Sequence, residues 1–181
     1  MKVLVFIDWF APAYKAGGPI QSIINLVNQP LEGLEYKIIC SNRDLDKHQL
    51  TSVPFDKWVR FNKQTEVWYN SNNKKIIEIL KLSLRWSPDI FFINGIYSFY
   101  YNFLPLIYGG GIKKIVSVRG MLHSGALSQK RFKKRAYIVI WKFLGLHHTS
   151  TFHATTPEEK NFVQTAFDEK TKVFVAQNFP R

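Results

Sequence analysis

The sequence predicts an α/β protein whose Rossmann-like parallel sheet is covered by helices on both faces. Its predicted strands are almost entirely apolar, which is typical of strands buried on both sides. Segments with apolar residues at helical spacing alternate with these strands. The first strand is also followed by a glycine-containing loop and a helix, the order that opens a βαβ unit.

The strands are predicted from short β-branched and aromatic runs that end at turn residues. In chain order they are Lys2–Asp8, Tyr36–Ser41, Trp58–Phe61, Glu66–Tyr69, Asp89–Asn94, Lys114–Val118, Thr151–Ala154 and Lys172–Ala176. Helices are predicted to start at Pro19 and to span Ser71–Trp86, Ser98–Tyr108, Ala126–Gly145 and Pro157–Phe167. The last has the clearest signal, because Thr156, Pro157 and Glu159 occupy the N-cap, first and third positions of a capping box.

One domain is expected from the length and composition. The chain has 181 residues, 46% apolar and 15% aromatic, which is enough for a core and too apolar for a disordered tail. Residues 1–176 are predicted to form this domain, and residues 177–181 to begin a linker. The single cysteine, Cys40, excludes a disulfide framework and a cysteine-based zinc site. The histidines lack metal-ligand spacing, so the sequence predicts no metal site. No cofactor is expected either.

Positive charge is concentrated in one region of the chain. There are 25 Lys and Arg residues against 13 Asp and Glu residues, a net charge of +12. Between Asp89 and Glu158 there is no acidic residue but there are nine basic ones. The expected partner is therefore anionic: phosphate groups, nucleic acid or an acidic membrane surface. A solvated basic face without a partner is the alternative.

Ligands of open parallel sheets bind outside the carboxyl ends of the strands. The substrate-binding candidates at these ends are Gly17, Gly18, Asn94, Tyr97, Arg119 and Gly120. The two glycines precede a helix N-terminus, where the backbone can approach an anion, although a plain turn explains them equally well. Arg119 and His123 are the catalytic candidates, because a guanidinium can enter the crevice and an imidazole can transfer a proton. An inert surface histidine is the alternative for His123.

The basic helix Ala126–Gly145 is predicted to have two different faces. An apolar stripe should face the sheet, and it consists of Phe132, Ala136, Val139, Ile140 and Phe143. The opposite, membrane-facing side is predicted to carry Arg131, Lys134, Arg135, Trp141 and Lys142, together with Ile138. Basic residues around an exposed tryptophan suit an anionic lipid surface. The alternative is that Ile138 and Trp141 pack under a neighbouring loop.

Several segments together resemble the N-terminal domain of a retaining glycosyltransferase of the GT-B fold, family four. They are Ala13–Leu26, Ser87–Ile90, Asn94–Gly95, Val116–Leu127 and His153–Glu159. The set covers nearly the whole chain. The Arg-Gly-Met-Leu sequence at Arg119–Leu122, ahead of a basic helix, is typical of bacterial polysaccharide-assembly members.

The resemblance implies transfer of a sugar from a nucleotide-sugar to a saccharide acceptor, expected to be lipid-linked, with retention at the anomeric carbon. It places the loop of Gly17 and Gly18 near the donor phosphates. Arg119 stands where many members have a histidine, so we expect it to contact substrate, and Glu158 or Glu159 matches a recurring glutamate. The donor site of the family lies largely in a second domain with a Glu-x7-Glu motif, which this sequence lacks. Residues 1–181 are therefore expected to be an N-terminal half, inactive alone.

Other functions use the same features. A non-catalytic Rossmann-like module would bind an anionic ligand or a lipid surface without chemistry. Nucleic-acid binding is disfavoured because the basic region lacks helix-turn-helix and aromatic-ladder patterns. A nicotinamide dehydrogenase is disfavoured by the missing G-x-G-x-x-G fingerprint. No run reaches the roughly 18 apolar residues of a spanning helix. The expected location is therefore the cytoplasm, with peripheral attachment to the inner face of the plasma membrane as the extension of the membrane hypothesis.

Overall fold

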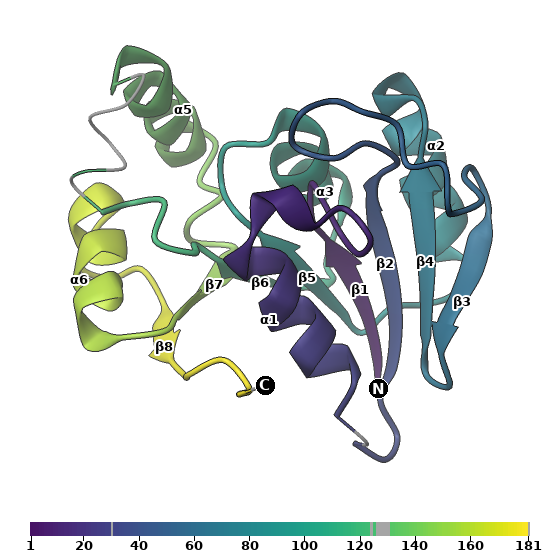
Figure 1. Ribbon diagram of the computed structural model, residues 1–181. Coiled ribbons are helices and arrows are strands. Elements are labelled where there is room, and N and C mark those ends of the chain that lie inside the picture. Colours follow the sequence, from purple (N-terminus) through teal and green to yellow (C-terminus); the bar gives the residue numbers. More distant parts are fainter. Residues whose placement is uncertain (30, 124, 126–130, 181) are drawn as a thin grey trace.

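The computed structural model describes residues 1–29, 31–123, 125 and 131–180. Within them, eight strands form one sheet in the order β3-β4-β2-β1-β5-β6-β7-β8 (Figure 1). Their bounds are β1 Lys2–Phe6, β2 Glu35–Ser41, β3 Trp58–Asn62, β4 Thr65–Asn70, β5 Ile90–Asn94, β6 Lys113–Ser117, β7 Ser150–Ala154 and β8 Val173–Val175. Neighbours pair in parallel except β3 and β4, which are antiparallel. The predicted Rossmann-like sheet is confirmed, with β3 as an antiparallel edge.

The helices alternate with the strands as expected. They are α1 Gly18–Val27, α2 Ile76–Leu84, α3 Leu104–Tyr108, α5 Arg131–Phe143 and α6 Pro157–Ala166, with short turns at Tyr14–Ala16 and Asn73–Lys75. The helix predicted at 98–108 is divided into a π-helical turn, Phe99–Phe103, and α3. Pro105 explains the division, because it has no N–H to donate to the carbonyl of Tyr101. The predicted start of the basic helix, residues 126–130, lies outside the described residues.

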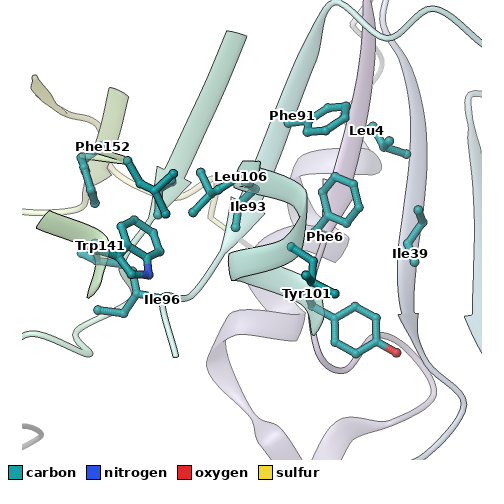
Figure 2. Close-up of a cluster of buried hydrophobic side chains, with 14 of the residues drawn as sticks. Leu4, Phe6, Ile39, Phe91, Ile93, Ile96, Tyr101, Leu106, Trp141 and Phe152 are labelled. Carbon is teal, nitrogen blue, oxygen red and sulfur yellow. The ribbon is translucent and has the colours of Figure 1, made fainter. Parts of the chain in front are cut away.

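Two layers of core lie on opposite faces of the sheet. Along β1, Leu4 and Phe6 point to one layer, and Val3 and Val5 to the other, as the two-residue period of a strand requires. The first layer includes buried side chains of α2, α3, α5 and α6, and Figure 2 shows its aromatic centre. The second layer is covered by α1, which crosses in front of the sheet in Figure 1. This arrangement leaves the carboxyl ends of the strands as the edge where loops gather.

The orientation of α5 corrects the prediction. Trp141, predicted to face a membrane, is only 1% exposed and packs against Phe152 and Phe167 with ring centroids 6.2 and 5.7 Å away. Figure 2 shows its indole beside Phe152 and Ile96. The stripe that was predicted to face the sheet points outward instead, with Phe132 88% and Phe143 87% exposed. The helix carries apolar residues on two sides, and the aromatic pocket between β7 and α6 accommodates the side that includes Trp141.

Candidate functional site

A cleft of about 640 Å³ lies at the carboxyl ends of β6 and β7, between the N-termini of α1 and α6. Its lining comes from four separate segments of the chain. These residues are Gly18, Pro19, Ser22, Arg119, Gly120, His123, Thr155, Thr156, Glu158, Glu159, Phe162 and Asn178. The position agrees with the general rule for ligands of open α/β sheets.

Arg119 is the most strongly positioned cation of this cleft. Its Nε and Nη2 donate to Asn94 Oδ1 at 3.2 and 2.8 Å, and its Nη1 donates to Asn178 Oδ1 at 2.6 Å. Burial lowers the pKa of the guanidinium to about 10, an effect that the nearby Glu159 carboxylate partly offsets, so it stays protonated at neutral pH. No ion pair to Arg119 occurs within the described part of the chain. A bound anion would therefore meet a positive charge that is held mainly by amide oxygens.

The backbone at Arg119 is in an uncommon conformation. Its φ is 53° and that of Gly120 is 70°, both in the left-handed region. For a residue with a side chain this costs energy, and such residues cluster at functional sites. The bend turns the chain after β6 so that the Gly120 N–H points at Glu159, which forms the next part of the cleft wall.

Glu159 joins the two loops that form the floor of the cleft. Its Oε1 accepts the Gly120 N–H at 2.5 Å, and its Oε2 accepts the Thr155 N–H at 2.5 Å and the Thr155 hydroxyl at 2.9 Å. The Thr156 hydroxyl accepts the Glu159 N–H at 3.1 Å, so the predicted N-cap is confirmed. The reciprocal bond of a capping box goes to Thr155 instead of Thr156. The Glu159 carboxylate therefore cross-links the loops after β6 and β7 through hydrogen bonds, whereas Glu158 is exposed at the rim of the cleft.

The other sequence-predicted site residues are only partly brought together. Gly18, Gly120 and His123 line the cleft beside Arg119. Gly17 is the N-cap of α1 with φ 73°, which favours glycine, but it does not line the cleft. His123 is exposed, accepts the Gly125 N–H on Nδ1 at 3.1 Å, and contacts Phe162 edge to face.

Asn94 and Tyr97 lie behind the cleft and not in its wall. Asn94 is 4% exposed and reaches the cleft only through Arg119, so it positions that guanidinium. The Tyr97 hydroxyl donates to the Met121 carbonyl at 3.4 Å, and the ring packs against Tyr137 of α5. Tyr97 thus connects the chain after β5 with the basic helix, where Lys134 stands over its ring.

The chain after β8 completes the site, which the sequence did not indicate. His153 of β7 donates from Nε2 to the Ala176 carbonyl at 2.8 Å, and its Nδ1 accepts the Ser117 hydroxyl at 2.9 Å. Burial lowers the pKa of His153, which favours this neutral form. Asn178 then reaches Arg119, and the Asn25 side chain donates to the Phe179 carbonyl at 3.0 Å. These long-range contacts have no local sequence signal.

Asp8 is a half-buried carboxyl group at the strand ends that sequence reasoning missed. It follows β1, whose neighbours β2 and β5 extend the sheet in opposite directions. The Ser98 hydroxyl donates to Asp8 Oδ1 at 2.6 Å. Burial raises the pKa of Asp8 to about 6, and the bond from Ser98 only partly offsets this. None of the cleft-lining residues contacts it through a described hydrogen bond, so it is a neighbour of the strand ends outside the cleft.

His147, His148 and Asp168 form the one group among the described residues that could hold a metal ion. His147 Nε2 lies 3.0 Å and His148 Nε2 lies 3.7 Å from Asp168 Oδ2. Sequence spacing missed the group because Asp168 lies after α6, far along the chain from the two histidines. The His147 contact connects the loop after α5 to the loop after α6, and the group does not line the cleft.

Comparison with known proteins gives a fold and no closer relationship. No protein-family model matches the sequence, and no curated protein sequence matches it. The structure is similar to sucrose-phosphate synthase from Thermosynechococcus elongatus, with a TM-score of 0.63 and 11% identity over 97% of this chain and 47% of that one. A second structure of that enzyme gives a TM-score of 0.55 and 7% identity, over 98% of this chain and 88% of the other. This chain has a GT-B-like Rossmann fold. It spans about half the length of the first of these structures.

In the described residues, no helix has the length and apolar composition needed to cross a membrane.

Proposed function

We propose that this chain is the acceptor-side, N-terminal domain of a retaining glycosyltransferase, which transfers a sugar from a nucleotide-sugar to a saccharide acceptor. The observation that supports this most directly is the cleft at the strand ends, in which the protonated Arg119 guanidinium is hydrogen-bonded to the side-chain amide oxygens of Asn94 and Asn178. A nucleotide-sugar brings a diphosphate, and that diphosphate leaves with negative charge during transfer. A fixed cation that stabilises the departing charge lowers the barrier.

The residues of the cleft have distinct proposed roles. Arg119 would bind phosphate or orient the acceptor, with Asn94 and Asn178 keeping its guanidinium in place. The N–H groups at the start of α1, beginning at Gly18, offer a second anion-binding element. His123 would exchange a proton with a substrate hydroxyl, because its ring lines the cleft and is open to solvent.

The proposed acceptor is a lipid-linked saccharide of cell-surface polysaccharide synthesis, used at the cytoplasmic face of the plasma membrane. The support for this is the family resemblance of the sequence and the concentration of basic residues after β6. Transfer from a nucleotide-sugar would need residues of a donor domain as well, so the proposed activity belongs to the whole enzyme. A non-catalytic module that only binds anions is the alternative, and it is favoured by the same guanidinium.

Isothermal titration calorimetry tests the proposal. Pyrophosphate and a panel of UDP-, ADP- and GDP-sugars are titrated into the chain and into Arg119→Gln. Arg60→Gln, at the exposed position of the edge strand β3, is the charge-matched control. We expect at least one phosphate compound to bind, and Arg119→Gln to weaken it about tenfold or more, since a charged hydrogen bond is worth roughly 1.5–3 kcal/mol. Equal binding by Arg119→Gln would contradict the proposed site.

A transfer assay distinguishes the enzyme from the binding module. The chain joined to a donor domain is supplied with radiolabelled nucleotide-sugars and a lipid-linked acceptor extract, and product is followed by thin-layer chromatography. Label in the lipid fraction that is lost in Arg119→Gln supports transfer. Phosphate binding without any label transfer favours the module.

A further inference from the structure

The outward side of α5 carries an exposed apolar stripe. We use the name α5 stripe for Phe132, Ala136, Val139, Ile140 and Phe143. Its four large members are exposed: Phe132 to 88%, Val139 to 63%, Ile140 to 45% and Phe143 to 87%. At 100° per residue, the stripe spans about 100° of the helix circumference. In Figure 1, α5 stands at the upper left margin of the molecule.

The opposite side of the same helix is the one that packs on the protein. Trp141 is buried against Phe152 and Phe167, and Tyr137 packs against Tyr97 and Phe103. These contacts determine the rotation of the helix about its axis. The α5 stripe is therefore held outward by the packing of its own opposite face.

Positive charge flanks the α5 stripe on both sides. On the helical wheel, Lys133 lies next to Ile140 on one flank, and Arg135 and Lys142 lie next to Val139 on the other. All three basic side chains are exposed. The helix Arg131–Phe143 contains no acidic residue. An apolar centre with cationic margins is complementary to a layer of acyl chains bounded by phosphate headgroups.

We propose that α5 binds the surface of a bilayer containing anionic lipid, with the α5 stripe inserted among the acyl chains. Lys133, Arg135 and Lys142 then lie at the level of the lipid phosphates, which their long side chains reach from the flanks of the helix. The helix lies in the plane of the interface, with its apolar face about 5–10 Å deep. A contiguous apolar surface of this kind differs from single exposed residues, which are ordinary.

Charge argues against a second copy of this chain as the occupant. Pairing two α5 stripes face to face would bring the basic flanks of both helices together, and like charges in contact are unfavourable. Nucleic acid would use the basic flanks but would leave the phenylalanines in water. The bilayer is the occupant that uses both the apolar and the charged residues.

This inference goes beyond sugar transfer, because vesicle binding depends on α5 and not on the cleft. The full chain is sedimented with vesicles of phosphatidylcholine alone and with vesicles containing about one third phosphatidylglycerol. We expect binding to the mixed vesicles at least about tenfold stronger than to the neutral ones, and weaker at high salt. If the chain does not bind vesicles but binds phosphate compounds in the cleft, the membrane inference fails and the proposed function does not. If it binds mixed vesicles but no phosphate compound, the proposed function fails and the membrane inference does not.

Two sets of variants separate the apolar and the charged contributions. Phe132→Ser with Phe143→Ser removes the large ends of the α5 stripe, and Leu45→Ser with Phe55→Ser is the control at exposed apolar residues elsewhere. Lys133→Gln, Arg135→Gln and Lys142→Gln together remove the flanking charge, and Lys57→Gln, Lys63→Gln and Lys81→Gln are the charge-matched control. Each α5 set should lower vesicle binding about tenfold or more, and each control set by less than about twofold. Unchanged far-UV circular dichroism and melting temperature establish that the variants fold.

Insertion itself is measured at Val139→Cys labelled with an environment-sensitive dye, because Cys40 is buried and does not compete for the label. A blue shift with mixed vesicles supports insertion of the α5 stripe. Equal binding to neutral and mixed vesicles would overturn the inference, and so would full binding by the Phe132→Ser, Phe143→Ser variant. Tighter binding to duplex DNA than to mixed vesicles, or a dimer that this variant dissociates in the absence of lipid, would also overturn it.

Discussion

The two helices that flank β7, α5 and α6, both carry apolar residues at helical spacing but place them differently. In α6, Val163 of the apolar face is fully buried, and the helix start is fastened by Thr156 and Glu159. In α5, the longer apolar stripe points outward, and Trp141, Tyr137 and Ile138 on the other side contact the core. The comparison shows that an amphipathic pattern indicates that a helix has an apolar face, but not which neighbour that face meets.

The largest expected effect distinguishes the two sides of α5. Trp141→Ala should lower the free energy of unfolding by about 3–5 kcal/mol, because a large buried side chain leaves a cavity. Phe143→Ala, which also removes an aromatic ring, should change it by less than about 0.5 kcal/mol because that side chain is 87% exposed. Urea denaturation followed by far-UV circular dichroism measures both. Similar losses in the two variants would show that α5 packs in some other orientation.

A second experiment examines the hydrogen bonds by which Glu159 stabilises the start of α6. Glu159→Gln keeps the shape but offers one oxygen, whereas the carboxylate accepts three hydrogen bonds from Gly120 and Thr155. We expect a loss of about 1.5–3 kcal/mol in unfolding free energy. Glu158→Gln removes the same charge at the exposed next position and should cost less than about 0.5 kcal/mol. Equal effects would mean that negative charge alone, and not the hydrogen bonds of Glu159 to Gly120 and Thr155, stabilises the start of α6.

Asp8 is a carboxylate that accepts one described side-chain hydrogen bond, from Ser98, whereas Glu159 accepts three. Its pKa is raised from 3.8 to about 6, so the folded protein holds a proton that the unfolded chain has lost between these values. Stability should therefore fall as pH rises from about 4 to about 6 and remain lower above that range. Asp8→Asn should remove this dependence and raise the unfolding free energy at pH 7 by on the order of 1–3 kcal/mol.

The measurement for Asp8 is a series of urea denaturations between pH 4 and pH 8. Glu32→Gln, at an exposed carboxylate, is the control and should keep the pH dependence of the parent chain. If Asp8→Asn keeps that dependence as well, another group causes it.

The smallest expected effect concerns the N-cap of α6. Thr156→Ala removes the hydroxyl that accepts the Glu159 N–H, and we expect a loss of about 1 kcal/mol. Thr156→Ser keeps the hydroxyl and should recover most of that loss. Thermal or urea unfolding of the three proteins measures the difference, and an Ala variant as stable as the Ser variant would show that Glu159 alone secures the helix start.

Most strands and helices could be predicted from local sequence. The apolar run Asp89–Asn94 predicts β5 to within one residue, and Thr156 and Pro157 predict the start of α6. The sequence predicts one helix at 98–108 and does not indicate its division between Phe103 and Leu104. In the candidate site, Arg119 and His123 were identified because they follow a strand, whereas the roles of Asn178 and Asp8 were not identified.

Local patterns determined the α/β class and the end of the strand that Arg119 follows. Apolar runs and turn residues are signals that a few consecutive residues contain. Tertiary structure decided which side of α5 is buried, since both sides of that helix are apolar and the aromatic partners of Trp141 and Tyr137 come from other elements of the fold. It also decided the partners of Arg119, which come from β5 and from the chain after β8. Contacts between residues distant in sequence depend on which strands lie side by side, and no short segment contains that information.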